Sequence, residues 1–103
     1  MQITAVQHIE DCLDGSFIKE ISLSTAVSKA IILYLATQQG AKLQYYPDFA
    51  RPFFKLTYNK GSYIKGVEGN STMRAVWWHC DEDEQWLRLA LQQAANDRAE
   101  KQQ

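Results

Sequence analysis

The sequence contains little that would cross-link the chain or carry it through a membrane. Its 103 residues include two cysteines, too few for a disulfide framework. The longest apolar run, from Ala30 to Ala36, has seven residues, whereas a membrane-spanning helix needs about 20. The opening residues, MQITAVQHIED, have neither the basic region nor the apolar core of a secretory signal. We therefore expect a cytoplasmic protein with no membrane partner, in which Cys12 and Cys80 stay reduced.

A surplus of either charge is also missing. The formal net charge is −1, from 11 Lys and Arg residues against 12 Asp and Glu residues. Proteins that bind nucleic acid usually carry a basic surplus, because neutralising phosphates supplies much of their affinity. A basic face could be hidden within this balanced total, but no run of Lys and Arg indicates one. Nucleic acid is therefore not an expected partner.

The composition that is present is that of an ordinary folded domain. Apolar residues make up 46% of the chain and charged residues 22%, close to the averages of about 45–50% and about 25% for globular domains. A chain of this length forms one domain, which we expect over residues 1–96. Residues 97–103 are polar with nothing to bury, and we expect them to be a frayed end.

Helical spacing of apolar residues occurs in three segments. Val6, Ile9 and Leu13 predict a short N-terminal helix over residues 5–13. A second, longer helix is expected between Ser22 or Ser24 and Gly40, and a C-terminal helix over residues 82–95. Residues 17–23 fit a strand or a helical turn, and the helical turn is slightly favoured.

Alternation with a period of two predicts strands over residues 53–58, 62–67 and 72–79. The connections Asn59-Lys60-Gly61 and Gly69-Asn70 are typical of hairpins. The predicted fold class is α+β: a three- or four-stranded antiparallel meander packed against the long central helix and the C-terminal helix, with the short N-terminal helix beside them.

The stretch WWHCDEDEQW, residues 77–86, has the strongest chemical character in the sequence. Its structural interpretation is a strand end followed by a helix start. Asp81 would cap the helix, with Glu84 at capping-box spacing, and acidic residues in a first turn interact favourably with the helix dipole. This interpretation accounts for the whole acidic cluster.

Two chemical interpretations compete with it. His8, Cys12, His79 and Cys80 could supply the two nitrogens and two sulfurs of a zinc site, but adjacent ligands on a strand diverge and differ from usual zinc spacing. Cys80 could be the nucleophile of a Cys–His hydrolase, although the carboxylates after it would raise its pKa. No other catalytic or phosphate-binding motif is present. We expect no catalytic residue, no metal and no cofactor.

The stretch YYPDFARPFF, residues 45–54, holds five aromatic residues and two prolines, which predict a stiff loop or an irregular edge. Aromatic residues and arginine are enriched at interface hot spots. Single-stranded bases could also stack on such rings, but no basic groove is indicated. We expect a non-enzymatic interaction protein, a homodimer or a subunit of a larger assembly, whose far sheet face is too apolar for a monomer. The candidate contact residues are Tyr46, Phe49, Arg51, Phe53, Tyr63 and Trp78.

The stretch LSTAVSKAIILYL, residues 23–35, resembles the recognition-helix segment of bacterial helix-turn-helix regulators. The resemblance implies an alternative, a winged-helix-like DNA-binding regulator with residues 24–39 as recognition helix and residues 53–67 as wing. Ile21 stands where such a motif has its turn glycine, and Lys29 is the helix's single cation.

Overall fold

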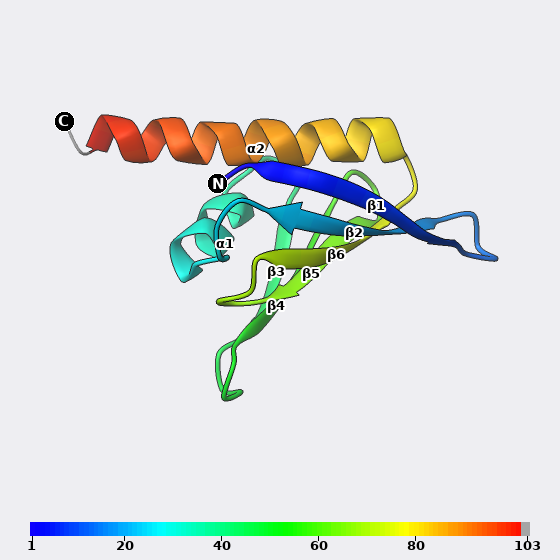
Figure 1. Cartoon of the computed structure of the whole chain (residues 1–103), viewed down its shortest axis with the longest axis horizontal. Helices are drawn as coiled ribbons and strands as arrows, with labels where there is room; N and C mark the ends of the chain where they lie inside the picture. Colours follow the sequence, from blue (N-terminus) through cyan, green and yellow to red (C-terminus); the bar gives the residue numbers. More distant parts are fainter. Residues whose placement is uncertain (102–103) are drawn as a thin grey trace.

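The computed structural model describes residues 1–101, with side chains for residues 1–96. It contains six strands and two helices (Figure 1). In chain order these are β1 (Ile3–Asp11), β2 (Phe17–Leu23), α1 (Lys29–Ala36), β3 (Lys42–Tyr46), β4 (Phe53–Tyr58), β5 (Ser62–Val67), β6 (Thr72–Trp77) and α2 (Cys80–Lys101).

All six strands form one antiparallel sheet in the order β1-β2-β6-β5-β4-β3. The α+β class with an antiparallel sheet is confirmed, and β4 and β5 have the predicted bounds. The predicted three- or four-stranded meander with a long central helix and an N-terminal helix is wrong. A hairpin of β1 and β2 joins the sheet through β6, and β3 adds a strand at the opposite edge.

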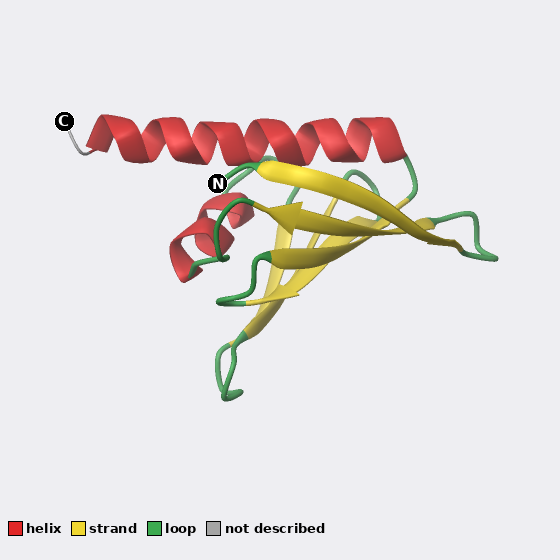
Figure 2. Cartoon of the chain, viewed as in Figure 1, coloured by secondary structure: helices red, strands yellow, loops and turns green. Residues whose placement is uncertain are grey.

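The two faces of the sheet have different surroundings. Both helices cover one of them, which we call the inner face, and α2 runs along the sheet while α1 lies beside β3 and β4 (Figure 2). Inner-face side chains such as Ile21, Phe54 and Trp77 are fully buried against helix residues such as Leu35 and Leu87. The opposite, outer face has no helix over it within residues 1–101.

The N-terminal helix predicted from Val6, Ile9 and Leu13 is a strand, β1. Register shifts interrupt its pairing with β2, one of them between Ile3 and Ala5. As a result Ile3 and Val6, three residues apart, lie opposite Leu23 and Ile21, two residues apart. A β-bulge therefore places Ile3 and Val6 on one face at a helical interval, whereas Ile9 is exposed and Leu13 lies in the turn after β1.

The central helix is shorter than predicted because the segment before it belongs to the sheet. Residues 17–23 form β2, and the backbone of Val27 then bonds to the turn at Gly69 and Asn70, with N–O distances of 2.8 Å. An extended residue held in this way cannot be helical. The helix begins only at Lys29, after the N-cap residue Ser28, whose hydroxyl accepts a hydrogen bond from the Ile31 amide.

Four of the five aromatic residues in the stretch 45–54 lie in strands rather than in a loop, and the fifth, Phe49, lies in the loop. Tyr45 and Tyr46 end the edge strand β3, and Phe53 and Phe54 begin β4 opposite them. The two prolines flank the connecting loop, residues 47–52, where no strand needs their missing amide hydrogen. This hairpin hangs below the rest of the molecule in Figure 1.

The C-terminal helix begins two residues earlier than predicted, at Cys80, and extends to Lys101. The frayed end predicted for residues 97–103 extends beyond the described residues. Of the helices described, none is both long enough and apolar enough to cross a membrane.

Candidate functional site

The outer face of β3–β6 is rich in cations and aromatic rings. Register and strand alternation place twelve side chains from these strands on it. They comprise Lys42, Gln44, Tyr46, Phe53, Lys55, Thr57, Tyr63, Lys65, Val67, Thr72, Arg74 and Val76. Four are cations and three are aromatic, and this set includes no acidic residue. This surface is the candidate site.

Three of the cations form a row across the sheet. Lys55 lies directly opposite Lys65, and Lys65 directly opposite Arg74. We call these three residues the basic row. Like charges directly opposite one another on neighbouring strands destabilise a sheet by about 0.2–1 kcal/mol per pair. The folded chain therefore keeps a charge arrangement that opposes its own stability.

The basic row is only partly compensated from within. The Lys55 ammonium lies 4.2 Å from the centre of the Tyr63 ring, a cation–π contact. Arg74 contacts the Glu20 carboxylate of β2 at 3.4 Å, and both groups are partly exposed. Among residues 1–96, Lys65 has no ion pair. The middle of the row is thus an exposed, uncompensated positive charge.

An aromatic cluster lies at the end of the outer face nearest the β3–β4 loop. Tyr46 and Phe53 stack with ring centres 4.5 Å apart, and the Phe49 ring lies 4.9 Å from Phe53. Tyr46 is 39% exposed and Phe49 57% exposed. Arg51 follows in the same loop and donates a hydrogen bond to the Asn70 side chain. The hairpin tip therefore presents two open rings.

A shallow hollow of about 450 Å³ joins the cluster to the basic row. Phe53 and Val67 line one part of it, and Lys65, Arg74 and Glu20 line another. Ligand sites usually measure about 300–1,000 Å³ and combine apolar walls with a few polar groups. The hollow has that composition.

The predicted contact residues are not all in one place. Tyr46, Phe49 and Phe53 form the aromatic cluster, and Tyr63 shares their face. Trp78 follows β6 at the other end of the sheet, with its ring beside the turns at Gly15 and Gly61. Sequence reasoning missed the four cations Lys42, Lys55, Lys65 and Arg74. The signal that could have found them is strand alternation, because each occupies an outward position of its strand.

The acidic stretch that starts α2 has a structural role centred on Asp83. This carboxylate is fully buried. It accepts hydrogen bonds from the Ser62 hydroxyl, the Asn59 amide group and the backbone amide of His79. The predicted cap, Asp81, lies instead within the first turn of the helix. One buried carboxylate thus joins the helix start to the β4–β5 turn.

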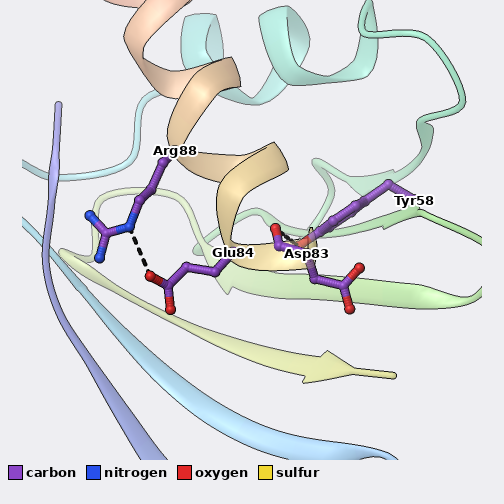
Figure 3. Close-up of polar contacts among 4 residues, drawn as sticks. All are labelled: Tyr58, Asp83, Glu84 and Arg88. Atoms are coloured by element: carbon purple, nitrogen blue, oxygen red, sulfur yellow. Dashed lines mark hydrogen bonds and ion pairs between the residues drawn. The ribbon is translucent and has the colours of Figure 1, made fainter. Parts of the chain in front are cut away.

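Two hydrogen bonds of the Tyr58 hydroxyl extend this network into the core. The Tyr58 hydroxyl donates to the Asp83 carbonyl oxygen at 3.2 Å and accepts from the Trp77 indole at 2.8 Å. Burial raises the pKa of Tyr58 far above its ordinary value, so its hydroxyl keeps the proton it donates. Figure 3 shows Tyr58 reaching the helix, with the surface pair Glu84 and Arg88 beside it.

The structure does not support a zinc site or a Cys–His hydrolase at residues 77–86. Burial, followed by the charges of Asp83 and Asp81, raises the pKa of the Cys80 thiol despite an opposing effect of Lys19. A raised pKa lowers the thiolate fraction, and the thiolate is the nucleophile. Among the described residues, no group of three or more His, Cys, Asp or Glu side chains is placed to hold a metal ion. His8, Cys12, His79 and Cys80 are therefore not gathered into one site.

The winged-helix alternative took residues 24–39 as the recognition helix and residues 53–67 as the wing, whereas the helical part of the first segment is Lys29–Ala36. Three residues of α1, Ile31, Ile32 and Leu35, are buried in the core. Strands β4 and β5 lie within the sheet between β3 and β6.

No protein-family model, curated protein or solved structure matches this chain.

Proposed function

We propose that this chain is a non-enzymatic, cytoplasmic binding protein that docks on a larger partner through the outer face of β3–β6. One observation carries the proposal: four cations and three aromatic rings share a sheet face that neither helix covers. Exposed aromatic rings and arginine are enriched at interfaces, and a cationic face steers the approach of an anionic partner. Tyr46, Phe49, Arg51 and Phe53 remain proposed contacts at the β3–β4 loop end of the face, and Tyr63 and Trp78 remain proposed contacts at the other end, near the β4–β5 turn.

Charge favours a different molecule over a second copy as the partner. In a face-to-face homodimer, the basic row of one chain would meet the basic row of the other. Like charges brought together at an interface cost several kcal/mol. We therefore propose a subunit of a larger assembly, and sedimentation of the chain alone at high concentration should show a monomer.

A photo-crosslinking amino acid placed at single exposed positions tests the proposal in the native host. At Phe49, on the outer-face hairpin, we expect an adduct with a partner. At Leu33 and Leu89, which are 46% and 49% exposed on the two helices, we expect none. These positions match Phe49 in exposure but lie on helices that cover the inner face.

Adducts of similar yield at all three positions would show random contact and contradict the proposal. An adduct of twice the chain's mass at Phe49 would replace the larger partner with a second copy. The readout does not depend on the partner's chemistry, so it tests the surface alone.

A further inference from the structure

We infer that the partner bound by the outer face is a single-stranded nucleic acid. This inference rests on the proposed function and specifies the chemistry of the partner. It reverses the expectation drawn from net charge, because the positive charge is concentrated in one part of the chain. Six of the 11 Lys and Arg residues, but two of the 12 acidic residues, lie between Lys42 and Val76.

The basic row fits a chain of phosphates. Neighbouring strands lie about 4.8 Å apart, so the row from Lys55 through Lys65 to Arg74 spans about 10 Å. A strand of nucleotides that crosses the sheet along the row could place one phosphate against each of the three cations. Phosphates would remove the repulsion between the opposed cations, which the chain's own residues compensate only in part.

The aromatic cluster fits the bases of the same strand. Tyr46 and Phe49 expose their rings next to Phe53, and the hollow of about 450 Å³ runs from Phe53 to Lys65 and Arg74. A nucleotide joins a planar ring to an anion, and this surface places rings next to cations. Stacking of bases on aromatic side chains tolerates any sequence, so we expect weak sequence preference.

Other anionic partners match less of the surface. An acidic peptide supplies anions but no planar rings for the aromatic cluster. A duplex is read by a helix or β-ribbon inserted into its major groove, and both helices of this chain lie on the inner face. The β3–β4 hairpin carries exposed rings rather than a row of polar base-reading groups.

Fluorescence anisotropy with the full chain provides the test, using labelled 12-nucleotide oligouridylate and oligothymidylate. We expect a Kd of about 1–100 µM near 0.1 M salt, typical of non-specific binding. For three phosphate contacts, log K should fall with log salt with a slope of about −2. The two probes distinguish RNA from DNA, and a 12-base-pair duplex and polyglutamate are the competing ligands.

Two substitutions separate the two types of contact. Lys65→Gln should weaken binding and reduce the salt slope by about 0.7. Tyr46→Leu should raise Kd about tenfold while the slope stays constant, since stacking carries no charge. Lys29→Gln removes a cation from α1, on the other side of the molecule, and should change neither quantity. Circular dichroism on each variant confirms folding, and both outer-face positions are exposed.

Binding that is absent at about 100 µM protein, or equally strong for polyglutamate or duplex, overturns the inference. Unchanged affinity in both Lys65→Gln and Tyr46→Leu does the same. If crosslinking at Phe49 captures a protein while the oligonucleotides fail to bind, the docking surface stands and its nucleic-acid assignment falls.

Discussion

The basic row leads to an unusual prediction for Lys65→Glu, which is that the substitution stabilises the protein. It replaces two like-charge pairs, with Lys55 and Arg74, by two opposite-charge pairs in the same register. Each cross-strand pair contributes about 0.2–1 kcal/mol. We take the low end, because Lys65 is exposed and solvent screens its charge.

The expected gain is about 1 kcal/mol in the free energy of unfolding, or about 4 °C in Tm for a domain of this size. Urea unfolding at low salt measures it. Lys65→Gln should give about half the gain, because it removes repulsion without adding attraction. Lys42→Glu, the matched control, makes the same charge change on the same face but lies opposite the uncharged Thr57, so its effect should be smaller.

Salt decides whether the cause is electrostatic. At about 1 M salt the Debye length falls to about 3 Å, and the advantage of Lys65→Glu should largely disappear. A stability loss at low salt, or a gain of equal size in Lys42→Glu, would refute the opposed-cation interpretation. If Lys65→Glu raises the stability of the protein and lowers its affinity for oligonucleotides, the basic row serves binding rather than folding.

Two further predictions concern the start of α2. Asp83→Asn should lower the free energy of unfolding by about 1.5–3 kcal/mol, because a buried charged acceptor of three hydrogen bonds is lost. The control Glu84→Gln removes a surface ion pair one residue later and should lower the free energy of unfolding by at most about 0.5 kcal/mol. Equal losses for the two variants in urea unfolding would contradict the stabilising role of the Asp83 hydrogen bonds. Burial raises the pKa of the Cys80 thiol, so in Cys12→Ser protein its alkylation by iodoacetamide at pH 8 should be slower than that of a free cysteine peptide. Because the folded state then holds its proton to higher pH than the unfolded state, Cys80 should lower stability as pH rises above about 8.5; a rate that levels off below pH 8 would contradict this assignment.

Local patterns in the sequence determined a large part of the sheet. Inward and outward side chains alternate along strands β4 and β5. In the turn between them Asn59, Lys60 and Gly61 all have positive φ angles, which asparagine and glycine adopt readily. The signal is local because each strand of such a hairpin pairs with its chain neighbour. The α2 helix was also predictable, since its apolar face has helical spacing over several turns.

Tertiary structure decided the elements whose partners are distant in sequence. A bulge against β2 places Ile3 and Val6 of β1 on one face at a helical interval, and the bonds of Val27 to the turn at residues 69–70 shorten α1. No pattern within either segment contains that information. Strand β3 was not predicted from the sequence, because the prolines of the stretch 45–54 indicated a loop. The structure places both prolines just outside the residues that pair.

One part of the candidate site could be predicted from the sequence, and the other part was decided by the tertiary structure. The aromatic cluster was predictable, because Tyr46, Phe49 and Phe53 are close in sequence. Strand alternation gives outward positions to Lys55, Lys65 and Arg74, but their alignment in one row was not predictable, since they stand nine or ten residues apart in the sequence. Only the register of three strands aligns them, because pairing across a sheet sets which distant side chains share a face. Net charge is a sum over the whole chain, so it does not show which charged side chains lie on the same face.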